Sequence, residues 1–235
     1  MKAIILAGGL GTRLAPITDK IPKALVPMGS RTLTEEVLSI LGHYGIHDIM
    51  LSIAHKKDQI KEKFGPAGKR GKGNIAYIKE DQPLGTAGPL IILNKQGKPI
   101  QETFFMVNGD NLFDVDLKAM LDFHRKKKGI ATIALSMVKN AKEYGVAVLD
   151  GDKIIRFIEK PQQPPSEYIN SGYYLLEPEV FGLLKGKERG MMEKDVFPQL
   201  AGQGKLYGFR SDGIWFDTGT LERYEKAKRE WKFQR

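Results

Sequence analysis

The sequence contains no cysteine among its 235 residues. A disulfide framework, a thiolate zinc site and a catalytic thiol are therefore excluded together. Long hydrophobic runs are also lacking, and no stretch approaches the roughly 18 apolar residues that a membrane-spanning helix needs. The N-terminal run MKAII is shorter than the apolar core of a secretory signal peptide and leads into glycines. We therefore expect a cytoplasmic protein with no membrane partner.

Motifs for nucleic-acid recognition are absent too, although the formal net charge is +9. Such a charge admits nucleic acid, an anionic surface or small polyanionic substrates as partners. The basic residues are dispersed, and no RRM, KH, helix-turn-helix or zinc-finger pattern accompanies them. We expect solvated surface charge and no nucleic-acid partner.

Strand-like and helix-like segments alternate along the first half of the chain. The expected strands are Ala3–Ala7, Ile49–Ala54, Asn74–Glu80 and Thr103–Asp110, and the expected helices are Thr34–Tyr44 and Asp58–Phe64. This alternation predicts an α/β fold with a mostly parallel mixed central sheet flanked by helices. Ligands bind such sheets at the carboxyl ends of the strands, where the glycine-rich stretch after Ala7 and Asp110 fall.

The second half has the spacing of antiparallel strands. These are Ala131–Val138, Gly145–Asp150, Lys153–Lys160 and Tyr168–Leu176, with a hairpin turn at DGDK and a closing helix over Leu221–Phe233. No linker or repeat divides the chain. We expect a single domain over 1–235, with one half at about 1–110 and a smaller antiparallel half at about 111–235.

The stretch AGGLGTRL, Ala7 to Leu14, is typical of an anion-binding loop. It lacks the third glycine of a dinucleotide-binding fingerprint and the Gly-Lys-Ser/Thr of a P-loop. A structural turn is the alternative, but Arg13 offers five donors suited to phosphate oxygens. Lys23, held between two prolines in IPKALVP, is a candidate second phosphate ligand.

Further motifs follow in a fixed order: PKALVP, QPLGTAGPL, VNGD, FIEKP, INSGYYLLEPEVF and DGIWFDTGT. With AGGLGTRLAPIT at the N-terminus, the chain resembles the sugar-1-phosphate nucleotidyltransferases over essentially its whole length. The resemblance implies a Rossmann-like nucleotidyltransferase fold and a transferase of nucleotide-sugar biosynthesis. Such an enzyme joins a nucleoside triphosphate to a sugar 1-phosphate and releases pyrophosphate, with no protein nucleophile.

The family pattern also implies roles for individual residues. Arg13, Lys23 and Asp110 would be catalytic, and Asp110 and Asp217 would bind Mg²⁺, which favours a few carboxylates completed by water and phosphate oxygens. The nucleotide-binding set is Leu6, Gly8, Gly9, Gly11, Thr12, Arg13, Lys23, Glu80, Pro83, Gly85 and Thr86. The sugar-phosphate-binding set is Gly145, Glu159, Lys160, Asn170 and Gly172. The two halves of the chain would then bind the nucleotide and the sugar phosphate, respectively.

Glu80 bears on the choice of base. Relatives that use uridine or thymidine triphosphates tend to carry glutamine there, whereas an ionised carboxylate only accepts hydrogen bonds. Guanine offers two adjacent donors, N1–H and N2–H₂, while uracil and thymine flank one N–H with two carbonyls. This favours GTP, and PLGTAGPL is also similar to mannose-1-phosphate guanylyltransferases, so mannose 1-phosphate or a similar sugar is expected. An alternative is that Glu80 merely ends a strand and points to solvent.

Other members of the class stay open as alternatives. They include glucose-1-phosphate uridylyl- and thymidylyltransferases, heptose-phosphate guanylyltransferases, and muramate or phosphocholine nucleotidyltransferases. A non-catalytic nucleotide-sugar sensor is disfavoured, because such subunits tend to lose the loop arginine, the lysine or a metal-binding aspartate. Nothing resembles the C-terminal left-handed β-helix of longer members, so we expect a monomer or a small homo-oligomer.

Overall fold

The structure is a computed structural model that describes residues 1–70 and 73–233. It divides into two compact units. The first unit comprises residues 1–83, 107–114 and 214–235, and the second comprises 84–106 and 115–213. The units therefore interleave along the chain, whereas the sequence analysis placed one boundary near residue 110. The second unit also holds more residues than the first, because the segment 84–106 belongs to it.

The first unit is built on parallel strands that the sequence analysis predicted. β1 (Lys2–Leu6), β4 (Asp48–Ile53) and β6 (Gly73–Lys79) are parallel neighbours, and β5 (Gly68–Arg70) pairs antiparallel with β6. Ile4, Ile5 and Leu51 are fully buried. Such continuous apolar runs are what a parallel sheet covered on both faces requires. The predicted α/β fold class is confirmed.

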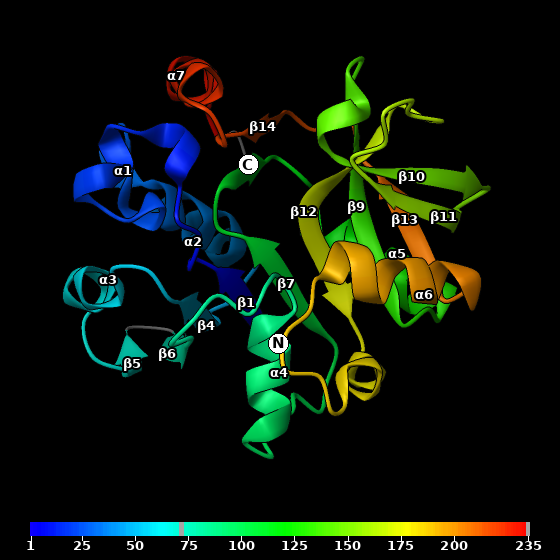
Figure 1. The fold of residues 1–235 in the computed structure, drawn as a ribbon, viewed down its shortest axis with the longest axis horizontal. Coiled ribbons are helices and arrows are strands. Elements are labelled where there is room, and N and C mark those ends of the chain that lie inside the picture. Colours follow the sequence, from blue (N-terminus) through cyan, green and yellow to red (C-terminus); the bar gives the residue numbers. More distant parts are fainter. Residues whose placement is uncertain (71–72, 234–235) are drawn as a thin grey trace. The chain divides into compact units, whose positions relative to one another are not determined.

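Helices and short elements complete the first unit (Figure 1). α2 (Leu33–His43) begins with a capping box, in which Thr32 and Glu35 satisfy each other's backbone N–H groups. α3 (Lys57–Phe64) follows β4. α7 (Leu221–Glu230) ends three residues before the predicted Phe233, because Trp231 has an extended backbone and donates its indole N–H to Glu36. The remaining elements are η1 (Thr12–Leu14), α1 (Ile17–Lys20), η2 (Lys23–Leu25), β2 (Pro27–Met28), β3 (Arg31–Thr32), β8 (Asn111–Phe113) and β14 (Trp215–Asp217).

β7 (Phe104–Asn108) is shorter than the predicted strand over 103–110. Gly109 and Asp110 instead form a turn into β8. The N–H of Gly109 donates to the carbonyl of Leu6 at 3.0 Å, and a Cβ at Gly109 would lie 2.7 Å from that oxygen. Glycine at this position therefore lets the turn approach the end of β1.

Besides the first three residues of β7, the second unit contains five whole strands: β9 (Ala131–Met137), β10 (Gly145–Asp150), β11 (Lys153–Glu159), β12 (Tyr168–Leu176) and β13 (Leu206–Arg210). Their order is β10-β11-β13-β9-β12, and a pairing between Val146 and Ile169 returns from β12 to β10. The pairs are antiparallel as predicted, except that β13 runs parallel to β9. The sequence analysis did not foresee β13, which the chain reaches only after the helix over Phe197–Gly202.

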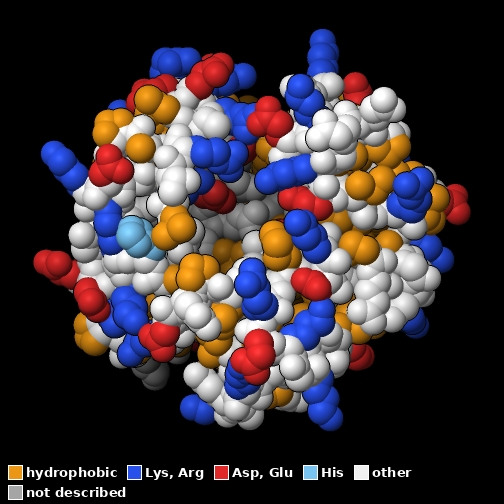
Figure 2. Space-filling view, in the orientation of Figure 1, with side chains coloured by type: hydrophobic (Ala, Val, Ile, Leu, Met, Phe, Trp, Pro, Cys, Tyr) orange, Lys and Arg blue, Asp and Glu red, His pale blue; other side chains and the backbone are white. Residues whose placement is uncertain are grey.

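The helices of the second unit are α4 (Gly88–Lys95), α5 (Leu117–Lys127) and α6 (Phe197–Gly202), with 3₁₀ turns at η3 (Ala141–Glu143) and η4 (Pro178–Leu184). A π-helical segment, η5 (Met192–Val196), leads into α6. Among the described residues, every helix is too short or too polar to cross a bilayer. On the face shown in Figure 2, the Lys and Arg side chains lie scattered among Asp and Glu.

Candidate active site

The predicted phosphate loop follows β1 in the first unit. Gly11 has φ of +68°, and a Cβ there would lie 2.8 Å from Cγ2 of Thr18 and 3.1 Å from Cβ of Lys23. The hydroxyl of Thr18 also donates to the carbonyl of Gly11 at 2.8 Å. Glycine is therefore required at residue 11 by both backbone conformation and space. At Gly8 a Cβ would lie 3.1 Å from the N atom of Ala54, just beyond β4.

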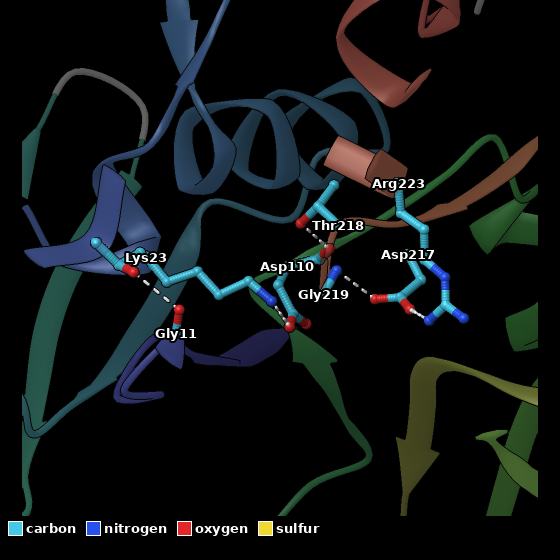
Figure 3. Close-up of polar contacts among 8 residues, drawn as sticks. Gly11, Lys23, Asp110, Asp217, Thr218, Gly219 and Arg223 are labelled. Carbon is cyan, nitrogen blue, oxygen red and sulfur yellow. Dashed lines mark hydrogen bonds and ion pairs between the residues drawn. The ribbon is translucent and has the colours of Figure 1, made fainter. Parts of the chain in front are cut away.

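Lys23 and Asp110 lie together, 87 residues apart in the sequence (Figure 3). The ammonium of Lys23 donates to Oδ2 of Asp110 at 2.5 Å, and the two side chains are 11% and 34% exposed. The loop glycine Gly11 packs against the Lys23 stem. Lys23 thus lies beside the glycine loop and brings Asp110 with it, and each of the two side chains carries a charge that the other balances.

Asp217 reaches the same region through pairing of β14 with β8, which sets it opposite Asn111. The backbone N–H and the hydroxyl of Thr218 both donate to the carbonyl of Asp110, the hydroxyl at 2.8 Å. Chain segments more than a hundred residues apart therefore bring the two predicted metal-binding aspartates to adjoining positions (Figure 3).

Two arginines lie near Asp217. Arg223, from the first turn of α7, donates to Oδ2 of Asp217 at 2.6 Å, and the N–H of Gly219 donates to Oδ1 at 2.7 Å. A Cβ at Gly219 would lie 2.7 Å from Oδ1 of Asp217 and 3.3 Å from Nη2 of Arg13. Gly219 therefore leaves room for the exposed Arg13 side chain beside this carboxylate.

The donor set fits a magnesium ion in its chemistry. Asp110 and Asp217 supply hard carboxylate oxygens, and Mg²⁺ is usually held by one or two carboxylates together with water and substrate phosphates. Among residues 1–70 and 73–233, no group of three or more His, Cys, Asp or Glu side chains could hold a metal on its own. A metal at this site would therefore take its further oxygen ligands from water or from substrate phosphates.

Glu80 comes directly after β6 and is buried, with 8% of its surface exposed. The hydroxyl of Ser52 in β4 donates to Oε1 of Glu80 at 2.7 Å, and the N–H of Glu80 donates to the carbonyl of Ile53. The alternative that Glu80 points to solvent is therefore wrong, because a neighbouring strand holds its carboxylate inside. Pro83 is the last residue of this segment of the first unit.

Gly85 and Thr86 belong to the second unit. Gly85 has φ of +88°, and a Cβ there would lie 2.3 Å from the carbonyl of Gly190. The hydroxyl of Thr86 donates to Glu193 at 2.5 Å and accepts from the N–H of Met192 at 2.9 Å. The predicted nucleotide-binding residues are thus divided between the two units.

The predicted sugar-phosphate residues all lie in the second unit. Gly145 pairs with Glu159 across β10 and β11, and a Cβ at Gly145 would lie 3.0 Å from Oε2 of Glu159 and 2.4 Å from the Phe157 ring. Burial raises the pKa of Glu159 above its ordinary value, while Lys160 and Lys194 oppose this. Lys160 is more than half exposed, 3.8 Å from Glu159, with φ of +49°.

Asn170 and Gly172 form an irregularity in β12, where the register with β9 shifts between Asn170 and Tyr174. The amide of Asn170 donates to the Tyr174 hydroxyl at 2.9 Å, and its oxygen accepts from the N–H of Gly172 at 2.9 Å. Gly172 has φ of +84°. Both the amide nitrogen and the amide oxygen of Asn170 therefore bond to other residues of β12 and stabilise its irregular shape.

A comparison with known proteins matches residues 2–232 to the nucleotidyl transferase family. The chain belongs to this family. It is 37% identical over 222 residues to the mannose-1-phosphate guanyltransferase of Saccharomyces cerevisiae, covering 93% of this chain and 61% of that protein. The curated relatives of this kind are thus longer, and the chain spans 61% of their length.

Solved structures agree with the family assignment. A Bacillus anthracis protein provisionally named glucose-1-phosphate thymidylyltransferase is 28% identical, with a TM-score of 0.88 over 100% of this chain and 98% of its own. HddC from Yersinia pseudotuberculosis, in complex with GMP-PN, is 27% identical, with a TM-score of 0.80 over 98% and 99% of the two chains. The predicted Rossmann-like nucleotidyltransferase fold is confirmed.

Sequence reasoning missed two residues of this nucleotidyl transferase family member. Arg223 contacts a predicted metal-binding aspartate from α7, where a charged residue on an amphipathic helix is ordinarily solvated. Glu193 is only 7% exposed, and burial raises its pKa despite the hydrogen bond from Thr86. Thr86, the partner of Glu193, lies 107 residues away, so no local pattern identifies Glu193. Arg223, by contrast, lies only six residues from Asp217, and its contact becomes visible only in the structure.

Proposed function

We propose that this chain transfers a nucleotidyl group from a nucleoside triphosphate to a sugar 1-phosphate. One observation carries the proposal: Lys23 and Asp110 form an ion pair against the glycine loop that follows β1. A phosphate loop, a cation and a carboxylate beside it are the parts that phosphoryl-type transfer needs, since catalysis there rests on positioning and charge stabilisation. Membership of the nucleotidyl transferase family supports the same reaction class.

In the proposed reaction, a phosphate oxygen of the sugar 1-phosphate attacks the α-phosphorus of the triphosphate. The new P–O bond forms as the bond to the β-phosphate oxygen breaks, and pyrophosphate leaves with its electron pair. Lys23 would hold the α-phosphate and the incoming phosphate near each other. Arg13, exposed in η1, would stabilise charge on the triphosphate or the leaving pyrophosphate. The backbone amides of Gly8 to Thr12 would wrap the triphosphate.

We propose that Asp110 and Asp217 hold a Mg²⁺ ion, whose charge would lower the repulsion between the reacting anions. Lys23 and Arg223 contact these two carboxylates. Each cation keeps its aspartate in place, and each is long enough to pair with a phosphate instead. The same four side chains can therefore rearrange their pairing when a polyanion binds.

For the sugar phosphate, we propose that Glu159 accepts hydrogen bonds from sugar hydroxyls and that Lys160 contacts the phosphate. Because Gly145 has no side chain, there is room beside it for the carboxyl group of Glu159. β11 ends at Glu159, and the next residue, Lys160, has a positive φ and therefore does not continue the extended strand. Asn170 and Gly172 would line the same pocket.

GTP is the proposed donor and mannose 1-phosphate, or a similar sugar, the proposed acceptor. The names of the yeast relative and the GMP-PN bound to HddC both support guanine. A carboxylate oxygen accepts more than one hydrogen bond, so the Glu80 carboxyl can accept from guanine while Ser52 donates to it. Release of pyrophosphate, measured with five nucleoside triphosphates against a panel of sugar 1-phosphates, tests both assignments. Fastest release with UTP or dTTP would contradict the choice of base.

Glu80→Gln tests the role of this carboxyl in choosing the base. The amide can donate to a pyrimidine carbonyl and accept from its N3–H, so the preference for GTP in kcat/KM should fall by about 5- to 150-fold, which corresponds to a bidentate base contact of about 1–3 kcal/mol. Ser52→Ala removes the donor to Glu80 and keeps the carboxylate, and it serves as the matched control. An unchanged ranking of the triphosphates in Glu80→Gln would assign Glu80 to packing alone.

We also propose a cytoplasmic monomer or small homo-oligomer that binds no nucleic acid. The scattered basic side chains on the visible face support the last point (Figure 2). Light scattering after size exclusion gives the oligomeric state. A filter-binding assay with duplex and single-stranded nucleic acid at moderate salt tests the absence of that partner.

A further inference from the structure

A buried carboxyl underlies the loop Leu84–Gly88 in the second unit. Glu193 accepts a hydrogen bond at 2.5 Å from the Thr86 hydroxyl, and the N–H of Met192 donates to that hydroxyl at 2.9 Å. The hydroxyl of Thr86 is thus held by a donor and an acceptor from consecutive residues of η5. Such a two-sided bond fixes the rotamer of Thr86.

The backbone of the loop is bonded to the same segment. The N–H of Ala87 donates to the carbonyl of Gly190 at 3.1 Å, and the N–H of Gly190 donates to the carbonyl of Leu84 at 2.9 Å. A Cβ at Gly85 would collide with the Gly190 carbonyl. The loop therefore packs directly on residues 190–193, and the Thr86–Glu193 bond joins a side chain of the loop to a side chain of this segment.

Residues 190–197, which carry Glu193, are themselves fixed by several contacts. Asp195 accepts from the N–H of Met191 at 2.7 Å and pairs with Lys187 at 2.8 Å. The ring of Phe197 lies 5.2 Å from that of Phe157 and 5.1 Å from that of Tyr174. A π-helical segment is rare and occurs frequently at functional sites, which marks η5 as a segment with a specific role.

Glu193 also lies within electrostatic reach of Glu159 and Lys160, the proposed sugar-phosphate residues. A second carboxyl beside Glu159 gives no evident advantage in binding a phosphate. The side chain of Glu193 is buried, and one of its carboxylate oxygens accepts a hydrogen bond from Thr86. These contacts favour a role in fixing the loop rather than a direct contact with substrate.

We propose that Glu193 is a positioning residue that, through Thr86, holds the loop Leu84–Gly88 in the conformation that binds the nucleotide. The inference rests on the proposed function, in which Gly85 and Thr86 bind the triphosphate substrate. It assigns a specific kinetic signature to Glu193: its loss affects the nucleotide and spares the sugar phosphate.

The first test is steady-state kinetics of Glu193→Ala with GTP and mannose 1-phosphate varied in turn. A hydrogen bond to a charged group contributes enough that its loss should raise the KM for the triphosphate about tenfold or more. The KM for the sugar 1-phosphate should stay within about twofold. A rise confined to the sugar 1-phosphate would overturn the proposal, because it would make Glu193 a sugar-binding residue.

Conservative variants separate this role from a loss of packing. Glu193→Gln keeps an acceptor for the Thr86 hydroxyl and should restore most of the nucleotide KM. Thr86→Val keeps the shape and removes the hydroxyl, whereas Thr86→Ser keeps the hydroxyl. If one bond carries the effect, Thr86→Val added to Glu193→Ala changes little further. Additive effects in the double variant, or a Gln variant as impaired as Ala, would overturn the proposal.

Hydrogen exchange gives a readout independent of activity. In Glu193→Ala, the amides of residues 84–88 should exchange faster than in the wild type, while those of β1 and β4 stay unchanged. The exposed Glu179→Gln is the matched control. If the wild type transfers no nucleotidyl group, the proposed function fails while the loop anchor is still tested; unchanged loop exchange in an active enzyme contradicts the anchor alone.

Discussion

The charged side chains of the two units are arranged differently. In the first unit, Lys23 lies against Asp110 and Arg223 lies against Asp217, so each predicted catalytic or metal-binding aspartate meets a cation. In the second unit, Glu159 and Glu193 are withdrawn from solvent and burial raises the pKa of both, while Lys160 stays exposed.

This difference corresponds to two kinds of recognition. Paired charges can exchange partners when a polyanion and a metal arrive, which suits phosphate chemistry. Buried carboxyls hold fixed positions and accept or donate hydrogen bonds, which suits the reading of hydroxyl groups and the anchoring of a loop. We therefore expect substitutions in the first unit to slow the chemical step and those in the second to weaken binding.

The largest expected effect is that of Asp110→Asn. It removes the carboxylate that pairs with Lys23 and that we assign to the metal. A metal supplies several kcal/mol of charge stabilisation, so kcat should fall by about 10³-fold or more. Excess EDTA should abolish wild-type turnover to a similar extent.

Asp122→Asn, at an exposed position of α5, is the matched control and should leave activity unchanged. Because Lys23 is only 11% exposed, loss of its partner also costs stability, so urea unfolding must accompany the kinetics. Full activity in EDTA, or of a folded Asp110→Asn protein, would contradict the assignment of Asp110.

Arg13→Ala should have the next largest effect. Its guanidinium lies beside Gly219 and Asp217, where charge on the triphosphate would develop. Loss of one such donor typically lowers kcat about 10²- to 10³-fold. Single-turnover rates separate this loss from a change in the KM for the sugar 1-phosphate, and Arg125→Ala is the exposed control. If Arg13→Ala changed only the KM for the sugar 1-phosphate, the proposal that substitutions in the first unit slow the chemical step would be contradicted.

Lys160→Ala should show the opposite pattern. Lys160 is exposed, and we assign it to the phosphate of the sugar substrate. Its loss should raise the KM for sugar 1-phosphate about tenfold, the lower end for a charged hydrogen bond, and leave kcat within about threefold. Lys118→Ala on α5 controls for net charge. A fall in kcat as large as that of Arg13→Ala would show that the two residues act in the same step.

Much of the first unit could be predicted because its signals are local. β1, β4 and β6 each contain a run of consecutive apolar residues. The glycine loop is visible in the sequence because Gly11 needs a positive φ and has no room for a side chain. The aspartates were identified by family register alone. Their closeness depends on the pairing of β14 with β8 across a hundred residues, which no local pattern encodes.

The second unit was harder to predict for the same reason. β13 joins the sheet only after η5 and α6, and Glu193 accepts its hydrogen bond from Thr86, 107 residues earlier in the chain. The strand predicted to reach Asp110 ends at Asn108, since the glycine that follows is bonded to the end of β1. Residues whose environment comes from distant segments are therefore the ones that sequence reasoning overlooks.

The smallest expected effect concerns His124, a further buried titratable group of the second unit. It is 1% exposed, with its ring nitrogens 2.7 Å from the Thr132 hydroxyl and 2.9 Å from Oε1 of Glu177. Burial lowers the pKa of His124 below 6.5, and the Glu177 carboxylate only partly opposes this. The unfolded chain therefore binds a proton more readily, and stability present above pH 6.5 is lost as the pH falls through the folded-state pKa.

Urea unfolding of the wild type and His124→Gln between pH 5 and 8 measures this contribution. Each unit by which the folded-state pKa is lowered corresponds to about 1.4 kcal/mol. The free energy of unfolding of the wild type should fall relative to the variant below pH 6.5, with turnover at pH 7.5 unchanged. The raised pKa values of Glu159 and Glu193 act with the opposite sign, since their contribution is lost as pH rises, and they are common to both proteins. A wild-type advantage that shrinks as the pH rises would instead mean that Glu177 raises the pKa of His124 and holds the ring protonated, and a constant difference would mean that folding leaves this pKa unchanged; either result contradicts the prediction.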